Sequence, residues 1–243
     1  MPATTSRRTP RPAGRDRTPR PGGRRQQILG CAAQLFASRG FHGVSVDDLG
    51  AAAGVTGPAL YRHFRSKEDI LAELLVGVSE RLLDGGRGRA QGAEDAAQAL
   101  GALIEFHVEF ALDEPDVITV QERDLASLPQ GANRAVRALQ HEYVSVWAGV
   151  VERLTGCSRE RAVAAAHAAF GLMNSTPHSA RLPRAQMAAL LRDMADAALR
   201  AVAGASARGP VTGPGDPTAR RGSWPVARGR GASAPSSPGR RRR

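Results

Sequence analysis

Apolar side chains recur at spacings of three and four residues from Arg24 to about residue 204, and this pattern predicts an all-α fold. No segment shows the alternation of apolar and polar residues that is typical of a half-buried strand. We expect the fourth helix to end at Gly85, with residues 86–92 as a linker, because glycines interrupt the pattern there. The expected helices span residues 24–39, 67–84, 94–112, 114–127, 132–155, 159–176 and 184–203, with two short helices between residues 45 and 64.

The two ends of the chain differ from the middle in composition. Residues 1–23 and 205–243 are dense in Arg, Pro, Gly, Ser and Thr and contain almost no large apolar side chains. Such segments bury too little apolar surface to offset the entropy of ordering, so we expect both to be disordered. The sequence therefore predicts a basic arm at 1–23, a small helical domain at 24–66, a larger helical domain at 67–204 and a basic tail at 205–243.

Charge follows the same division. The formal net charge of the chain is +11, but residues 1–25 carry +7 and residues 205–243 carry +8, which leaves −4 for the middle. A basic chain suggests a polyanionic partner such as nucleic acid. Because the helical middle is mildly acidic, any contact with nucleic acid must be local or come from the tails.

Residues with metal-binding or catalytic chemistry form no recognisable pattern. Cys31 and Cys157 lie far apart and outside any CxxC motif, which argues against a disulfide framework and a zinc site. The sequence also lacks an HExxH motif and a nucleophile elbow, so we expect no enzyme, no catalytic residue, no cofactor and no metal. It has no run of eighteen apolar residues and no signal peptide, so we expect a cytoplasmic protein without membrane contact.

Residues 45–64 have the layout of two short helices around a tight turn, which is the arrangement of a helix-turn-helix. Ser45 is expected to cap the first helix, with Asp48 three residues later. Gly54 supplies the positive φ that turns the chain without steric cost. Thr56 is expected to cap the second helix, which is short enough to enter the major groove of DNA.

The exposed side of this second helix would face the bases. It displays Gly57, Pro58, Ala59 and Arg62. Arg62 is the candidate for a guanine edge, and the carbons of Pro58 and Ala59 are candidates for a thymine methyl group. The chain is therefore predicted to bind double-stranded DNA through this helix.

A longer string of residues extends the motif on both sides. Its elements are Gly40-Phe41, Ser45, Leu49, Ala53-Gly54-Val55-Thr56, Leu60-Tyr61-Arg62-His63-Phe64 and Ser66-Lys67-Glu68. This string resembles the TetR family of bacterial transcription repressors, and the resemblance covers residues 24–75. It implies an N-terminal three-helix DNA-binding domain followed by a helical domain for ligand binding and dimerisation.

The resemblance also assigns contacts to DNA phosphates. The residues in the family's phosphate-binding positions are Ser45, Thr56, Tyr61, His63 and Lys67. Gly50 departs from the family, which usually has alanine there, and is expected to loosen the packing of the two short helices without changing how they dock.

By the same resemblance, the C-terminal helices enclose a small-molecule effector, and the last two form a four-helix bundle with a second copy of the chain. A two-fold dimer implies a pseudo-palindromic operator. The expected ligand contacts are Phe106, His107, Phe110, Arg123, Tyr143, Trp147 and Phe170. The dimer contact is expected along the apolar stripe of the last helix, which contains Met187, Leu190, Leu191, Met194, Ala198 and Val202.

Two segments, residues 122–125 with Pro129 and residues 171–178, resemble TetR relatives of high-GC bacteria linked to fatty-acid, acyl-CoA or sterol catabolism. We therefore predict a repressor that an acyl-CoA or related lipid metabolite releases from its operator. Two alternatives stay open. The aromatic residues at helical spacing also suit a plain hydrophobic core, and the Arg-rich tails also suit a non-specific DNA-binding protein held by counterion release.

Overall fold

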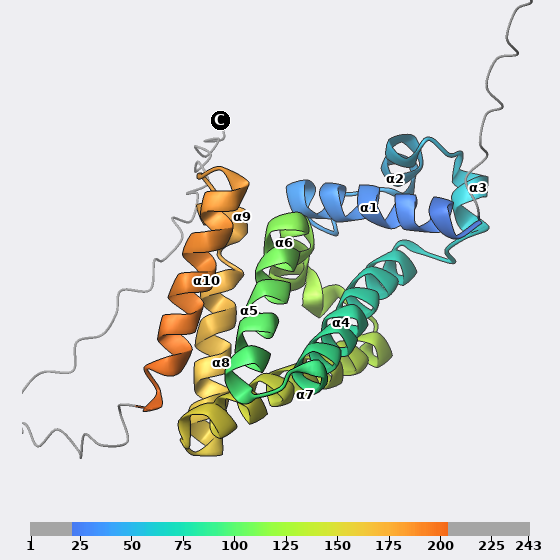
Figure 1. Cartoon of the computed structure of the whole chain (residues 1–243). Coiled ribbons are helices and arrows are strands. Elements are labelled where there is room, and N and C mark those ends of the chain that lie inside the picture. The colour runs from blue at the N-terminus through green and yellow to red at the C-terminus, as the bar shows by residue number, and fades with distance from the viewer. Residues whose placement is uncertain (1–20, 204–243) are drawn as a thin grey trace, which may run out of the picture. The chain divides into compact units, whose positions relative to one another are not determined.

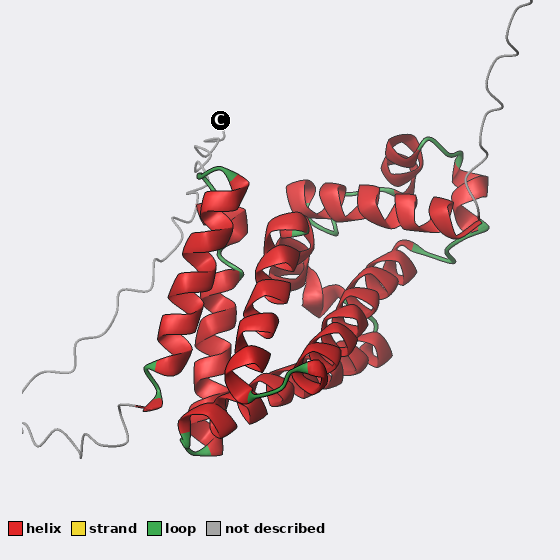
Figure 2. Cartoon of the chain, viewed as in Figure 1, coloured by secondary structure: helices red, strands yellow, loops and turns green. Residues whose placement is uncertain are grey.

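The computed structural model describes residues 21–203, and every regular element in this range is helical (Figure 1, Figure 2). This confirms the all-α prediction. Residues 21–23 of the predicted basic arm begin the first helix, and the rest of both predicted tails lies outside the described residues. The elements are α1 (Pro21–Arg39), α2 (Val46–Ala53), α3 (Gly57–Tyr61), α4 (Lys67–Gly92), α5 (Ala96–Asp113), α6 (Pro115–Asp124), the short 3-10 helix η1 (Leu125–Ser127), α7 (Gln130–Thr155), α8 (Arg159–Met173), α9 (Thr176–Ser179) and α10 (Arg184–Arg200).

Local signals in the sequence set several helix ends. Gly40 has a φ of 79°, and its amide donates to the Phe36 carbonyl at 2.8 Å, which ends α1 at residue 39 as predicted. The Ser66 hydroxyl accepts a hydrogen bond from the Asp69 amide at 3.2 Å and so starts α4. These boundaries follow from side chains and glycines adjacent in the sequence, which is why they are predictable.

Two hydrophobic clusters fill the interior of the described residues, which belong to one structural unit. The N-terminal core joins α1, α2, α3 and the first half of α4 to Val117 and Val120 of α6 and Val136 of α7. The C-terminal core joins the second half of α4 to α5, α7, α8 and α10. The N-terminal core therefore crosses the predicted domain boundary at residue 66. Within it, α6 packs directly against α1 (Figure 1).

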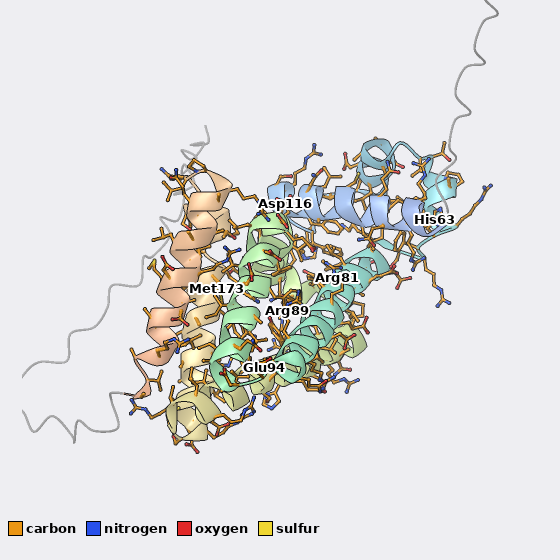
Figure 3. The ribbon with its side chains drawn as sticks, viewed as in Figure 1. His63, Arg81, Arg89, Glu94, Asp116 and Met173 are labelled. Atoms are coloured by element: carbon orange, nitrogen blue, oxygen red, sulfur yellow. The ribbon has the colours of Figure 1, made fainter. Side chains whose placement is uncertain are left out.

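Helix α4 departs from the prediction, because it runs without a break from Lys67 to Gly92. The linker expected at residues 86–92 is therefore wrong. Arg87 pairs with Glu142 of α7, and the guanidinium of Arg89 lies 3.9 Å from the centre of the Phe106 ring of α5. Figure 3 labels Arg89 on this part of α4. These contacts make the segment part of the bundle.

Two glycines of α4 allow close packing and do not break the helix. A Cβ atom on Gly85 would lie 2.3 Å from the Phe106 ring, and a Cβ atom on Gly86 would lie 2.5 Å from the Tyr143 ring. Both distances are shorter than those of real Cβ contacts, so only glycine lets α5 and α7 approach α4 this closely. The packing outweighs the cost of about 1 kcal/mol that glycine carries in a helix interior.

The remaining predicted helices agree with the structure to within three residues at each end. Helix α8 ends at Met173, and Pro177 lies in the first turn of the short helix α9. The Thr176 hydroxyl donates to the Ala111 carbonyl at 2.6 Å, which fixes α9 against the end of α5. Helix α10 then lies beside α5 and α8 (Figure 1).

Replacement of Gly86 by alanine is expected to lower the free energy of unfolding by about 1 to 3 kcal/mol, because the new Cβ would overlap the Tyr143 ring. Gly88→Ala is the matched control. A Cβ at Gly88 meets nothing within 4 Å, so alanine should raise stability by up to about 1 kcal/mol through helix propensity. Urea denaturation measures both changes, and an equal gain from both substitutions would contradict close packing at Gly86.

Candidate functional site

The first short helix of the predicted helix-turn-helix is closed at both ends. The Ser45 hydroxyl accepts from the Asp48 amide at 3.1 Å and donates to the Asp48 carboxylate at 2.6 Å, to which the Ser45 amide also donates at 2.9 Å. These bonds, the hydroxyl bond foremost, hold the pKa of Asp48 below its ordinary value. Gly54 ends α2 with a φ of 64°. The expected cap and turn are both confirmed.

Gly50 tightens this turn, which corrects the expectation that it loosens the packing. Its carbonyl accepts a hydrogen bond from the Val55 amide at 2.9 Å. A Cβ atom on Gly50 would lie only 2.9 Å from the Val55 carbonyl oxygen, so an alanine would push α2 away from the chain that enters α3. The absence of a side chain therefore permits a closer turn.

Helix α3 presents a mixed surface to solvent. Tyr61 is 55% exposed, and the Thr56 hydroxyl forms no capping hydrogen bond, contrary to the expectation that it caps α3. Together with the Arg62 guanidinium, these hydroxyl groups are available to a neighbouring molecule. Of the predicted DNA contacts, Ser45, Thr56, Pro58, Tyr61 and Arg62 are exposed, and Gly57, Ala59, His63 and Lys67 are half-buried.

Arg25 of α1 holds the end of α3 in place, close to His63, which Figure 3 labels. Its guanidinium forms a double ion pair with Glu73 of α4, donates to the His63 carbonyl at 2.5 Å and lies 4.4 Å from the centre of the Phe64 ring. The hydrogen bond to Glu73 raises the pKa of Arg25. Sequence reasoning missed this link, because Arg25 and Glu73 lie 48 residues apart and belong to no motif.

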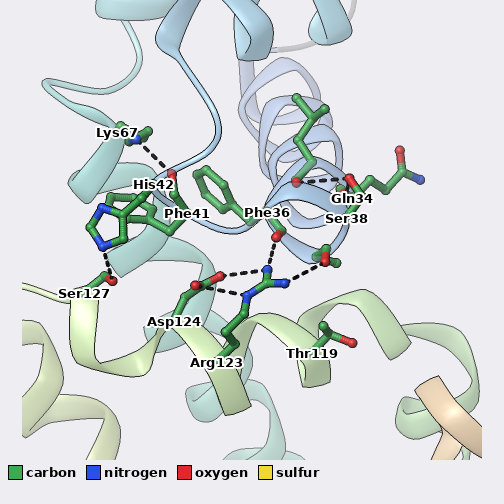
Figure 4. A network of polar contacts seen from close by, with 12 residues as sticks. Gln34, Phe36, Ser38, Phe41, His42, Lys67, Thr119, Arg123, Asp124 and Ser127 are labelled. Atoms are coloured by element: carbon green, nitrogen blue, oxygen red, sulfur yellow. Dashed lines mark hydrogen bonds and ion pairs between the residues drawn. The ribbon is translucent and has the colours of Figure 1, made fainter. Parts of the chain in front are cut away.

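Lys67 has a structural role that its sequence position did not reveal. Its ammonium group donates to the carbonyl of Phe41 (Figure 4) and to the carbonyl of Val44, each at 2.8 Å. It also lies 4.4 Å from the centre of the Phe41 ring. Two of its three N–H groups thus hold the connection between α1 and α2. One N–H group is left for another acceptor, such as the predicted phosphate.

The C-terminal end of α1 rests on Arg123 of α6 (Figure 4). The guanidinium donates to the carbonyl of Phe36 and, at 3.1 Å, to the carbonyl of Ala37. Carbonyls in the last turn of a helix lack partners within the helix, and a cation beside them also complements the helix dipole. Arg123 therefore caps α1 from a position 86 residues further along the chain.

Asp124 and Ser127 complete this contact between α1 and α6, which we call the α1–α6 joint. The Asp124 side chain is buried and accepts from Arg123 at 3.1 and 3.3 Å. The Ser127 hydroxyl forms a hydrogen bond of 3.2 Å with the imidazole of His42. The guanidinium of Arg123 is used in the joint, and Arg123 does not line the cavity described next, so its expected role as a ligand contact stays a prediction.

A cavity of about 210 Å³ lies among α4, α5, α6, α7 and α8. Four of the seven predicted ligand residues line it, namely His107, Phe110, Tyr143 and Phe170. The aromatic rings of Tyr143 and Phe170 are stacked with their centres 5.4 Å apart. The complete lining consists of Ser79, Leu82, His107, Phe110, Ile118, Gln121, Gln140, Tyr143, Val144, His167, Phe170 and Asn174.

His107 is buried at the centre of a polar chain in this cavity. Its Nδ1 lies 3.2 Å from the Tyr143 hydroxyl, and its Nε2 lies 3.0 Å from Oδ1 of Asn174. Because an amide oxygen only accepts, Nε2 carries the proton and Nδ1 accepts from Tyr143. Burial lowers the pKa of His107 to about 4 and raises the pKa of Tyr143, so both side chains are neutral at physiological pH.

Phe106 and Trp147 do not line this cavity, and their expected role as ligand contacts stays a prediction. Phe106 packs against Gly85 and beneath the guanidinium of Arg89. Trp147 is fully buried, with its ring edge-on to Phe170 at a centre distance of 5.0 Å, and its indole N–H has no partner within residues 21–203. Trp147 is therefore part of the C-terminal core, whereas Phe106 is half-buried and lines a second pocket between α4 and α5.

Sequence reasoning missed most of the polar lining of the cavity. The missed residues are Ser79, Gln121, Gln140, His167 and Asn174. Single amides, hydroxyls and imidazoles scattered over four helices and the residue after α8 form no motif, and only the packing of the helices brings them together. The one usable signal was the segment at 171–178, which contains Asn174.

The apolar stripe predicted on α10 divides between two surroundings. Met187 and Leu191 are buried in the C-terminal core, so they cannot form the expected dimer contact. Leu190 and Met194 lie one turn apart and are 43% and 46% exposed. Helix α8 also exposes three small residues, Ala164, Ala168 and Gly171. We call these three residues together with Leu190 and Met194 the α8–α10 face.

Two further properties concern residues 21–203 alone. No group of three or more His, Cys, Asp or Glu side chains in this range is placed to hold a metal ion. No helix in the same range combines the length and the apolar character that a membrane crossing requires.

Two parts of the chain match known protein families. Residues 28–74 match the family described as bacterial regulatory proteins, tetR family. Residues 93–179 match the family described as tetracyclin repressor-like, C-terminal domain. The first match covers the helix-turn-helix, and the second covers most of the helices that enclose the cavity.

Individual proteins show the same relationship. The HTH-type transcriptional activator FasR of Mycolicibacterium smegmatis is 32% identical over 126 residues, which are 50% of this chain and 58% of FasR. The HTH-type transcriptional repressor KstR2 of Rhodococcus jostii is 32% identical over 145 residues, which are 59% of this chain and 70% of KstR2. The crystal structure of the TetR family regulator PfmR from Thermus thermophilus has a TM-score of 0.62 and 26% identity, and covers 71% of this chain and 97% of that one. The chain therefore belongs to the TetR family of DNA-binding transcription regulators, which are not enzymes.

Proposed function

We propose that the chain is a dimeric repressor whose affinity for a pseudo-palindromic operator is controlled by a small molecule bound in the cavity. The observation that carries this proposal is the course of α6. Its residues Ile118 and Gln121 line the cavity, and two residues later Arg123 caps α1. A ligand that displaces α6 therefore acts on α1, against which α2 packs, and α2 in turn carries α3.

The relatives support a regulator of transcription, but they differ in whether they activate or repress it. FasR is named an activator and KstR2 a repressor. We favour repression because the match with KstR2 covers the larger share of the relative. A reporter gene behind an operator selected from the parent genome tests this choice, since deletion of the regulator should raise expression.

For the effector we propose an acyl-CoA or related lipid metabolite. The regulator FadR of Bacillus subtilis was solved in complex with stearoyl-CoA, and at 16% identity it shows only that such a fold accepts this ligand. The cavity of about 210 Å³ is smaller than the range of about 300 to 1,000 Å³ that is typical of sites for drug-sized ligands. Only the acyl end of a thioester would therefore enter it, with the nucleotide outside.

We propose that the α8–α10 face meets the same face of a second copy. Leu190 and Met194 form an apolar patch on α10, and the small residues of α8 let two further helices approach closely. A two-fold arrangement of this kind places two copies of α3 side by side for the two half-sites of the operator.

The contacts of α3 with DNA are tested by two substitutions. Tyr61→Phe removes one hydroxyl and should weaken binding to operator and unrelated DNA alike, by about fivefold, because a phosphate contact carries no sequence information. Arg62→Ala should weaken operator binding by about tenfold more than binding to unrelated DNA, because it removes a base contact. Fluorescence anisotropy with both DNAs measures the affinities.

Arg134→Ala, an exposed position on α7, serves as the control for lost charge. Lys67 is less suitable as a probe, because its replacement also leaves the carbonyls of Phe41 and Val44 without a donor. If neither α3 substitution lowers affinity, α3 is not the reading helix.

The α1–α6 joint is tested by Arg123→Met. The substitution removes the cap of α1 and leaves the buried Asp124 carboxylate without its ion pair. The free energy of unfolding should therefore fall by about 1 to 2 kcal/mol. An acyl-CoA that releases the wild-type operator complex should still bind the variant but release the operator less. Arg134→Met is the control with the same chemical change. If Arg123→Met releases the operator as readily as the wild type, α6 does not transmit the effect of the ligand.

The dimer face is tested by the double substitution of Leu190→Glu and Met194→Glu. Sedimentation velocity should show a monomer, because the introduced carboxylates repel each other across the two-fold axis. Circular dichroism should show unchanged helical content, because both positions are exposed in the single chain. Ala189→Glu, also exposed on α10, should remain dimeric. A dimer formed by the double variant would place the interface elsewhere.

A further inference from the structure

We infer that the cavity binds a compact, uncharged carbonyl group, such as a ketone, an amide or a thioester, and excludes the free carboxylate of the same shape. This inference rests on the proposed function, since it names the ligand class of the same cavity. It follows from three observations: the charge of the lining, the direction of its hydrogen bonds and the size of the enclosed space.

The described side chains that line the cavity carry no formal charge. None of the described residues that form it is Asp, Glu, Lys or Arg, and its polar groups are hydroxyls, amides and imidazoles. A carboxylate that loses its water shell needs a cation or several N–H donors in return. The guanidinium groups nearby are occupied, since Arg123 caps α1 and Arg89 covers the Phe106 ring.

His107 does not supply the missing positive charge. Its Nε2 donates to Asn174 and its Nδ1 accepts from Tyr143, so a second proton on Nδ1 would require the Tyr143 hydroxyl to turn from donor to acceptor. Burial keeps the pKa of His107 near 4, which also favours the neutral ring. The other imidazole of the lining, that of His167, is exposed to water.

The hydrogen bonds instead suit a neutral acceptor. Because Oδ1 of Asn174 accepts from His107, its Nδ2 group stays available, and it donates to no described residue. The side chains of Gln121 and Gln140 bring two further amide groups to the lining. A carbonyl oxygen accepts one or two such N–H bonds without carrying a charge into the site.

The rest of the lining selects a small hydrocarbon beside this carbonyl. The rings of Phe110, Tyr143 and Phe170 provide aromatic surface, and Leu82 and Ile118 provide aliphatic surface. A cavity of about 210 Å³ is smaller than the range of about 300 to 1,000 Å³ that is typical of sites for drug-sized ligands. A single ring or a short branched chain with one carbonyl therefore fills it.

Two sets of isosteric probes test the inference on the full-length protein. The first set is acetophenone, benzamide and benzoate, and the second is cyclohexyl methyl ketone, cyclohexanecarboxamide and cyclohexanecarboxylate. Within each set the shape is constant, and at about pH 7.5 only the carboxylate is charged. Isothermal titration should show that the best neutral member binds at least about tenfold more tightly than its carboxylate.

The variant Asn174→Leu locates this binding in the cavity. It keeps the approximate volume and removes the amide donor, so it should weaken the neutral probes about tenfold and leave the carboxylates unchanged. Gln130→Leu, an exposed amide at the start of α7, is the control and should change neither. Thermal denaturation shows whether Asn174→Leu still folds, and Gln140→Leu provides a second variant of the lining if it does not.

The outcomes separate this inference from the proposed function. Carboxylates that bind as tightly as the neutral probes, an absence of binding by all neutral probes, or neutral binding that no lining variant weakens would overturn the inference. An operator complex followed with the same probes reports on the proposed function. If the neutral probes bind but do not affect the operator complex, the proposed switch is refuted and the ligand class still holds. If a carboxylate releases the complex, the switch is supported and the ligand class is refuted.

Discussion

The distance at which other helices can approach α4 is the constraint on which the rest of the structure depends. Its first half belongs to the N-terminal core and its second half to the C-terminal core, so the two cores are joined through this one helix, against which α1, α5, α6 and α7 pack. Gly86 lets the Tyr143 ring lie directly against the helix backbone. The same Tyr143 donates to His107, so the geometry of the cavity follows from a missing side chain on α4. A methyl group there would move the cavity wall.

Helix α1 is supported at both ends by arginine, and the two supports belong to different helices. At one end Arg25 connects it to α3 and to Glu73 of α4, and at the other Arg123 of α6 holds its last carbonyls. In the proposed switch, a movement of α6 relative to α4 changes the tilt of α1 and of α2, which packs on α1 and carries α3. Because both arginines bond to carbonyl oxygens, the supports act on the backbone and resist rotation of single side chains.

The sequence predicts well what is decided locally. The Ser45 cap, the Gly54 turn and the end of α1 at Gly40 depend on neighbours within a few residues, and all three are confirmed. The interruption predicted at Gly85 fails because glycine has two uses, to break a helix or to admit a close neighbour, and only the ring of Phe106 in the folded chain decides between them. The role of Arg123 was equally hidden, since its partners are backbone carbonyls, which have no sequence signature. Periodicity found the apolar positions of α10 but could not say that Leu191 faces its own core and Leu190 does not.

The reading surface of α3 is small, and this has a consequence for how the proposed switch works. One guanidinium and a few carbons distinguish only a few base pairs in each half-site, and the net charge of −4 between residues 26 and 204 adds no attraction elsewhere on the body. In the proposed dimer, discrimination depends on both half-sites being occupied at once, with the two copies of α3 about 34 Å apart. A ligand need not unfold or distort α3 to release such a protein. It is enough that a displacement of α6, passed to α1 through Arg123, changes the spacing of the two helices so that only one half-site is met at a time.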